Sequence, residues 1–535
     1  MSGENRADGE LNPKYPGGTA LQRERLEAED HRIVARGRRN IRYYVENWQE
    51  ALAGFTDDPD SRECALRGET EPMELIRQRI LDTLEGVRAH SRDQIARLTD
   101  RAALTDYAAL VRDEDGREVW SDALQRAIDE HQVVVIPARA EPYWIDRQIV
   151  VGSDRRIEAE GATIVQTPGC DVLMLRNAST ADGARAPIRS DARDRNISIF
   201  GGRWEESRRE RVGSGASGKY DAARSFFGVQ TMFFFNNMEG LTLENVTFAH
   251  AGSFAVQIGD VRDAIFEKIR FVECYADGLH INGNTTNLLC RDVRGQVGDD
   301  LVALNAYDWQ ESSVDFGPIS TVLCDGLELS PDSGYKALRI EPGRYCYDDG
   351  SEVDCAIRDA IIRDVRGIKT FKLYYQTPCY RIGDAPERGG VGSADNLFFE
   401  DIRVDLDEPV DLFSEYLESD PVRGAFAAFE IGANVGSLAL RNIDLWLDGG
   451  KFPMACLVAA GPKSIVRGDS EVFDPYVSCE VGRLFVQNLR INGEAAGPAD
   501  QRIFREIRFD DVDRDGHSTG RGTFGEVLLD GRKIR

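Results

Sequence analysis

Short apolar strands recur at a fixed interval along the middle of this chain. The segments FAVQI, DGLHI and DLVAL begin at Phe254, Asp277 and Asp300, so consecutive strands start 23 residues apart. Within each segment apolar residues alternate with others, which places every second side chain on the same face of a strand. A constant period in the twenties, with one strand in the same phase of each unit, is typical of a solenoid. The pattern therefore predicts rungs stacked about 4.8 Å apart.

The same kind of strand returns further along the chain. It appears as ALRI at 337–340, FKLYY at 371–375 and AAFEI at 427–431, after intervals that inserted loops have lengthened. Loops gathered after one strand of a solenoid usually line its binding face. We therefore expect an all-β fold over residues 116–535, a single-stranded right-handed parallel β-helix. An amphipathic segment at 121–131 is followed directly by VVVIP, which predicts a helix that covers the first rung.

The pattern before residue 116 is different. Residues 1–20 are polar and rich in Gly and Pro, which predicts a disordered or extended N-terminus. Over residues 21–115, charged segments with apolar residues three or four positions apart predict an α-helical N-terminal region, most clearly at 73–98. We expect this region to serve as a structural cap or as the contact of a homo-oligomer. The alternative is that it forms a wall of the binding cleft.

Composition narrows the choice of partners. A formal net charge of −26 on 535 residues opposes binding to nucleic acid, which requires clustered Lys and Arg. The chain contains no apolar run of membrane-spanning length and no apolar segment of a secretory signal at its start, so we expect a cytoplasmic protein without a membrane partner. The ten cysteines are scattered and are expected to be reduced, with a Cys346–Cys355 bridge as the alternative. No pattern predicts a metal or another cofactor.

Three carboxylates lie at the entrances of two adjacent strands. Asp277 opens one strand, and Asp299 and Asp300 stand at the start of the next. Stacking would gather them in one place, where mutual repulsion makes one proton harder to remove. One protonated and one ionised carboxylate are what hydrolysis of a glycosidic bond requires. The sequence therefore predicts a catalytic cluster, although Gly-Asp-Asp is also ordinary turn chemistry.

Polar side chains are expected to surround this cluster. Alignment of the rungs on their inward residues predicts an outward column that contains Arg339 and Tyr374 in register, with Lys372 in the neighbouring column. Gly278 and Ala303 would form the floor of an open groove, and aromatic residues would stack on sugar rings. For each of these residues a solvated position or loop packing is the alternative. The predicted substrate-binding residues are Gln257, His280, Trp309, Lys336, Arg339, Tyr345, Lys372, Tyr374 and Glu430.

The motifs YADG at 275–278 and GDDLVAL at 298–304 resemble those of glycoside hydrolase family 28, the polygalacturonases and their relatives. NISIFGGRW and the run NNMEGLTLENVTFAHAGSFAVQI upstream are also similar, and the resemblance covers roughly residues 120–380. It implies a right-handed parallel β-helix that hydrolyses a glycan. It further implies that Asp299 is the general acid, that Asp277 and Asp300 activate water, and that the reaction inverts the anomeric configuration.

The chain differs from that family at the residues that would recognise the substrate. Tyr275 and Ala276 replace the family's Asn-Thr, and His280 replaces an acidic residue. Tyr335 and Lys336 stand where Gly-His-Gly is expected, and Lys372-Leu373-Tyr374 replaces Arg-Ile-Lys. We therefore expect a carbohydrate substrate other than the standard one of the family. The alternatives are another β-helix carbohydrate enzyme, either a lyase or an intramolecular transferase, and a carbohydrate-binding solenoid without catalysis.

Overall fold

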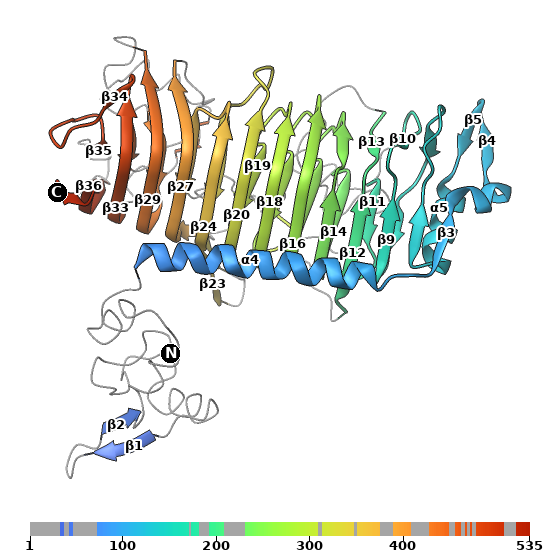
Figure 1. Cartoon of the computed structure of the whole chain (residues 1–535), viewed down its shortest axis with the longest axis horizontal. Helices are drawn as coiled ribbons and strands as arrows, with labels where there is room; N and C mark the ends of the chain where they lie inside the picture. Colours follow the sequence, from blue (N-terminus) through green and yellow to red (C-terminus); the bar gives the residue numbers. More distant parts are fainter. Residues whose placement is uncertain are drawn as a thin grey trace. The chain divides into compact units, whose positions relative to one another are not determined.

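Parallel strand pairing runs through the computed structural model of this chain. Strand β16 (Val256–Val272) pairs with β17 (Leu279–Asn282), and β17 pairs with β19 (Val302–Asn305). Val256, Leu279 and Val302 are in register, as the 23-residue period predicts. Successive rungs lie side by side along the molecule, in chain order (Figure 1). The predicted fold class, a right-handed parallel β-helix, is confirmed.

The structure describes residues 33–36, 42–45, 72–170, 173–180, 192–207, 231–308, 313–346, 350–374, 389–407, 427–448, 455–461, 466–467, 471–472, 478–507 and 521–535. The chain divides into two compact units, Met1–Arg79 and Ile80–Arg535. The first contains an antiparallel pair, β1 (Ile33–Arg36) and β2 (Arg42–Val45). The second contains the β-helix.

One face of the β-helix, here called the long-strand face, contains the middle part of the longest parallel strands; the longest, β16, has 17 residues and its two ends extend onto the neighbouring faces. Their pairing is continuous from the first strand to the last because each rung adds one strand to the same sheet. In order, the strands are β3 (Arg101–Ala103), β6 (Val133–Val135), β9 (Arg155–Glu158), β12 (Asp194–Phe200), β14 (Phe233–Glu244), β16, β18 (Thr285–Gly295), β20 (Ile319–Leu329), β24 (Ile357–Arg366), β27 (Ser393–Leu406), β29 (Asn434–Leu447), β33 (Cys479–Ile491) and β36 (Gly522–Leu529).

A second face, the short-strand face, carries the predicted functional residues. It begins with β8 (Ile149–Val151) and β11 (Leu175–Asn177) and continues through the first residues of β14 and β16. From there its strands are β17, β19, β21 (Ala337–Glu341), β25 (Thr370–Tyr374), β28 (Ala427–Gly432), β30 (Cys456–Ala460) and β35 (Phe504–Glu506). A third row starts with β5 (Arg117–Val119), β7 (Tyr143–Ile145), β10 (Thr163–Gln166), β13 (Arg203–Glu205) and β15 (Thr247–Ala249), and then merges with the ends of the long strands.

Several short strands form antiparallel pairs in addition to these parallel rows. They involve β4 (Arg112–Glu114) with β5, and β22 (Gly343–Cys346) with both β23 (Glu352–Cys355) and β26 (Gly389–Val391). The others involve β31 (Val466–Arg467) with β32 (Glu471–Val472), β34 (Glu494–Ala495) with β33, and β37 (Arg532–Lys533) with β36.

Residues with left-handed backbone conformation mark the corner at which the long strands turn. Asp263 and Asn287 occupy equivalent positions on consecutive rungs, with φ of 62° and 60°. Asn and Asp tolerate this conformation better than other residues with a Cβ. The Asn287 side-chain amide donates to Asp263 Oδ1 at 2.7 Å, so the corner residues also bond from rung to rung. These corners let one strand pass from one face to the next.

Helix α5 (Ser121–Glu130) agrees with the prediction for 121–131. Its apolar side buries Leu124 and Ile128 in the core cluster, so it covers the beginning of the solenoid as expected. Helix α4 (Met73–Ala96) agrees with the prediction for 73–98. The part of α4 that belongs to the second unit packs on the long-strand face, where Arg88 Nε lies 2.8 Å from Glu267 Oε1.

The prediction that residues 21–115 are α-helical throughout is wrong. Besides α4, the described part of this region contains β1, β2, β3, β4 and a 3-10 helix at Leu104–Leu110. Segments such as IVAR and RYYV are rich in β-branched and aromatic residues, which favour strands. Strand β3 pairs with β6, so the sheet of the β-helix begins before residue 116.

The core contains several free thiols. Cys274, Cys290 and Cys324 are buried and free, as expected. Cys355 is free as well, which excludes the alternative bridge to Cys346. Burial raises the pKa of the Cys274 thiol to about 12, so this thiol is unreactive. Among the described helices, none is long and apolar enough to span a bilayer.

Candidate active site

The structure brings the three predicted carboxylates together. Asp277 lies two residues before β17, and Asp299 and Asp300 lie three and two residues before β19, on the next rung. The Asp300 backbone N–H donates to Asp277 Oδ1 at 3.1 Å. One carboxylate oxygen from each of the three residues lies within 4.8 Å of the other two.

The three carboxylates differ in their exposure to solvent. Asp277 and Asp300 are buried, whereas 23% of the Asp299 side chain is exposed. Burial raises the pKa of Asp300 well above its ordinary value; the Arg339 cation opposes this shift, and the charges of Asp299 and Asp277 add to it. Asp300 therefore retains a proton to higher pH than an ordinary carboxyl, and Asp299 is the member that a ligand can reach.

Arg339 links the cluster to the next rung. Its Nη2 donates to Asp299 Oδ1 at 3.1 Å, and its Nε lies 3.1 Å from Asp300 Oδ2 and 3.5 Å from Glu341 Oε1. The guanidinium supplies positive charge among three carboxyl groups. The carboxylates are close enough together to hold a divalent cation, but Arg339 already provides compensating charge at two of them.

His280 lies behind the cluster, away from solvent. Its Nδ1 is 2.6 Å from Asp277 Oδ2, and its Nε2 is 3.1 Å from Asp308 Oδ2. Burial works against the charged imidazolium, but the hydrogen bonds to Asp277 and Asp308 outweigh it and raise the pKa of His280 to about 9. The ring stacks on Phe254, with centroids 3.8 Å apart and planes inclined by 12°.

The predicted alignment of Tyr374 with Arg339 is wrong by two residues. Arg339 pairs with Lys372, which pairs with Glu430. Lys372 is therefore in the same outward column as Arg339, and Tyr374 aligns with Gly432 instead. The Lys372 ammonium is fully buried, 3.9 Å from Glu430 Oε2 and 5.6 Å from the ring centre of Tyr335.

The remaining predicted substrate-binding residues differ in their burial and in their partners. Gln257 is buried and donates to Asn282 Oδ1 at 2.8 Å, and Lys336 is half-buried before β21. Tyr345 does not fit its predicted stacking role, since it is 4% exposed and its ring packs on Phe316 with centroids 4.0 Å apart. Trp309 and the side chain of Tyr374 lie outside the described residues.

The predicted open floor is also wrong. Ala303 is buried, and a Cβ on Gly278 would lie 2.6 Å from Leu301 O, so neither residue lines a groove. Sequence reasoning missed three polar members of the site, Asp308, Glu341 and Tyr335. Asp308 follows β19 and Glu341 ends β21, both on the short-strand face. These positions indicate the site only once the register of the strands is known.

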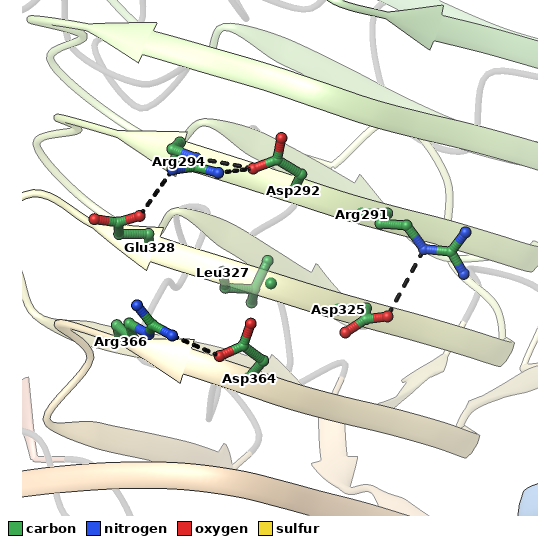
Figure 2. Close-up of a pocket in the computed structure, with 9 residues that line it drawn as sticks. Arg291, Asp292, Arg294, Asp325, Leu327, Glu328, Asp364 and Arg366 are labelled. Atoms are coloured by element: carbon green, nitrogen blue, oxygen red, sulfur yellow. Dashed lines mark hydrogen bonds and ion pairs between the residues drawn. The ribbon is translucent and has the colours of Figure 1, made fainter.

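A second group of charges lies on the long-strand face, where β18, β20 and β24 run side by side (Figure 2). It surrounds a surface hollow of about 360 Å³. Arg294 donates to Asp292 and lies 3.1 Å from Glu328 Oε2, and Arg366 lies 3.5 Å from Asp364 Oδ1. These charges are paired along and between exposed rungs, as on an ordinary solvated sheet face.

Comparisons with known proteins give no family for this chain. No family model and no curated protein matches it. Among solved structures, a hyperthermoactive exopolygalacturonase from Thermotoga maritima is 13% identical, with 84% of this chain and 97% of that chain covered and a TM-score of 0.42. A family 28 exopolygalacturonase from Yersinia enterocolitica is 12% identical, with 80% and 78% covered and a TM-score of 0.38.

A protein of another kind is also similar. PfbA, a surface adhesin of Streptococcus pneumoniae, is 11% identical, with 81% of this chain and 92% of that chain covered and a TM-score of 0.35. Similarities of this size assign neither a family nor an activity to the chain. What the fold and the site define is a parallel β-helix with a buried carboxylate cluster on its short-strand face.

Proposed function

We propose that this chain is a glycoside hydrolase that cleaves a poly- or oligosaccharide by acid/base catalysis. The observation that carries the proposal is the meeting of Asp277, Asp299 and Asp300, from two adjacent rungs, within 4.8 Å. Glycosidic hydrolysis needs one carboxyl group to protonate the leaving oxygen and one carboxylate to activate water or attack the sugar. A cluster in which one member retains its proton supplies both forms at the same pH.

The division of roles follows the exposure and the partners of each carboxyl group. Asp299, the exposed member, is placed to meet the glycosidic oxygen, and the Arg339 guanidinium fixes its direction. Asp300 stays protonated because it is buried next to other acidic groups, so it takes no part in the transfer: Asp299 gives its own proton to the glycosidic oxygen, and Asp277 takes one from the attacking water. Asp277 accepts hydrogen bonds at both oxygens and is the ionised base.

The substrate would carry a negatively charged group. Lys336 lies half-buried on the rung next to the cluster, and Tyr335 offers an aromatic ring beside Arg339 and Lys372. Lys372 is fully buried beside Glu430, so it supports the site rather than touching the substrate. Lysine side chains bind anionic groups, and aromatic faces stack on sugar rings. Glu430, one rung further, would accept hydrogen bonds from sugar hydroxyls. In this proposal Gln257 supports the site through Asn282 rather than touching the sugar.

The experiment measures new reducing ends over a panel of neutral and uronate-containing glycans. Asp299→Asn and Asp277→Asn are each expected to lower turnover by about 10²–10⁴-fold, the usual contribution of a general acid or base. Asp292→Asn is the matched control, because Asp292 also lies beside an arginine on these rungs but on the long-strand face. Equal turnover in all three variants and the wild type would remove the proposal.

The same panel separates the alternatives. An unsaturated product that absorbs in the ultraviolet would indicate a lyase, and binding without release of sugar would indicate a carbohydrate-binding solenoid. The anomer released first, followed by proton NMR, separates an inverting enzyme from a retaining one. The resemblance to family 28 implies inversion.

A further inference from the structure

A chain of hydrogen bonds continues from the carboxylate cluster into the protein. His280 lies between two acidic residues, with Nδ1 2.6 Å from Asp277 Oδ2 and Nε2 3.1 Å from Asp308 Oδ2. All three side chains are buried, and the two acids come from the residues just before β17 and just after β19. The imidazole thus bridges consecutive rungs and has no route to a substrate of its own.

The two carboxylate contacts favour a doubly protonated ring. A neutral imidazole has one N–H and one lone pair, so one of the two carboxylate contacts would set a lone pair against an anionic oxygen. With both nitrogens protonated, each contact becomes a charge-assisted hydrogen bond. The face of Phe254 stacked on the ring also favours a cation.

Two amides complete the surroundings of the ring. Asn282 Nδ2 lies 3.3 Å from His280 Nε2, and its orientation is fixed because Asn282 Oδ1 accepts from Gln257 and from the Val314 backbone N–H. This amide would prefer an unprotonated Nε2, but it is neutral and more distant than Asp308. Asn305 Nδ2 donates to Asp308 Oδ2 at 3.3 Å. The two carboxylates therefore dominate the charge around the imidazole.

We propose that His280 is a positioning residue that holds Asp277 ionised and fixed in direction, and thereby leaves the proton of the cluster to Asp299 and Asp300. The catalytic role of His280 rests on the proposed function, but its charge and its contact with Asp277 do not. Asp277 Oδ1 accepts from the Asp300 backbone N–H and Oδ2 from the imidazolium; both hydrogen bonds favour the ionised carboxylate, and each oxygen keeps a further lone pair that can take the proton of water.

The balance of charge supports this division. Asp277, Asp299, Asp300, Asp308 and Glu341 face two cations, His280 and Arg339. Five ionised carboxylates in a largely buried space would be strongly unfavourable, so at least one proton must be retained. His280 compensates the two acids at one end of the network, and Arg339 faces the others. The retained proton is then at Asp300, because the burial of its side chain outweighs the charge of Arg339.

The first test does not depend on activity. Selective ¹⁵N labelling of histidine and NMR should give His280 signals of an imidazolium at pH 7, with titration near pH 9. His280→Gln assigns these signals among the six histidines. Asp308→Asn removes one of the two carboxylate charges and should move the titration to lower pH. A neutral His280 ring at pH 7 in the wild type would overturn the proposal.

The second test uses the pH profile of turnover. His280→Gln removes the cation beside Asp277, so the acidic limb of kcat/KM should move up by about one pH unit or more. We expect kcat to fall by about 10–100-fold with KM changed less than twofold, because His280 does not touch the substrate. An unmoved acidic limb would contradict the positioning role.

A matched control is available at the surface. His131 also contacts an aspartate, with Nδ1 3.0 Å from Asp100 Oδ1, but in a partly exposed position remote from the cluster. His131→Gln should change neither the kinetics nor the His280 signals. The two tests fail separately: full turnover in Asp299→Asn would remove the proposed hydrolase, whereas the NMR titration would still decide the charge of His280.

Discussion

The carboxylate cluster on the short-strand face uses the same residue types, on neighbouring rungs, as the charged hollow on the long-strand face. Figure 2 shows the hollow. The ion-pair distances are also alike, 3.1 Å for Arg339–Asp299 and 3.1 Å for Arg294–Glu328. The surroundings differ. In the hollow 45% of Arg294 and 53% of Glu328 are exposed, whereas Asp300 in the cluster is fully buried.

The pKa values of Asp292 and Asp300 shift in opposite directions. In the hollow, partial burial is outweighed by hydrogen bonds from Arg270 and Arg294, which lower the pKa of Asp292. In the cluster, burial dominates and raises the pKa of Asp300, although Arg339 lies 3.1 Å away. The comparison teaches that a carboxylate–arginine pair alone does not mark a site. A raised carboxyl pKa is a better indication where it coincides, as at Asp300, with two further acidic residues within 4.8 Å.

The largest expected difference between the two regions is the loss of unfolding free energy when the arginine of each is replaced. Arg339→Gln leaves buried acidic groups without their guanidinium and should cost about 3–5 kcal/mol of unfolding free energy. Arg294→Gln removes exposed pairs and should cost about 0–1 kcal/mol. Urea unfolding of the wild type and both variants at pH 7 measures the two costs. Equal shifts in the midpoint would show that the two regions do not differ as the burial implies.

A smaller effect, of opposite sign in the two regions, is expected for the aspartates. The folded state raises the pKa of Asp300, so it prefers the protonated form and is penalised as pH rises above about 3.9. Asp300→Asn should therefore stabilise the protein at pH 7 by about 1 kcal/mol or more, while lowering turnover.

For Asp292 the sign is reversed. The folded state lowers the pKa of Asp292, so its ionised form contributes stability above about pH 3.9 that is lost as pH falls. Asp292→Asn should then destabilise the protein slightly at pH 7, by less than about 1 kcal/mol. Urea unfolding from pH 4 to pH 8 gives both curves. Destabilisation by Asp300→Asn at pH 7 would contradict this explanation of the cluster.

Sequence alone was sufficient for the parts of the fold that depend on period. The 23-residue spacing sets the rungs, and it placed Asp277 and Asp300 next to each other because no loop is inserted between their strands. Beyond a long insertion the same reasoning failed. In FKLYY both Phe371 and Leu373 are apolar, and a shift of two residues keeps every side chain on the same face. Alternation therefore could not place Lys372 beside Arg339.

The partners of the cluster were beyond sequence reasoning for another reason. Asp308 lies 28 residues after His280, in the turn after the next strand, and Glu341 ends a strand beyond an insertion. Nothing in the local pattern distinguishes these acids from solvated ones; their contacts depend on how the turns close. The corner residues Asp263 and Asn287 did leave a signal, since Asn and Asp recur at matching positions.

The smallest expected effect is the response of the ion pairs to salt. It tests whether exposure to solvent, rather than the distance between the charges, causes the difference between the cluster and the hollow. A double-mutant cycle on Arg294 and Glu328 should give a coupling of about 0.2–1 kcal/mol at low ionic strength. In 1 M NaCl the Debye length is about 3 Å, so this coupling should fall towards zero. The cycle on Arg339 and Asp299 has the same 3.1 Å separation but is partly shielded from solvent, so it should keep most of its value. If salt weakened both couplings equally, solvent would screen the cluster as fully as the hollow, and the retained proton at Asp300 would lose its physical basis.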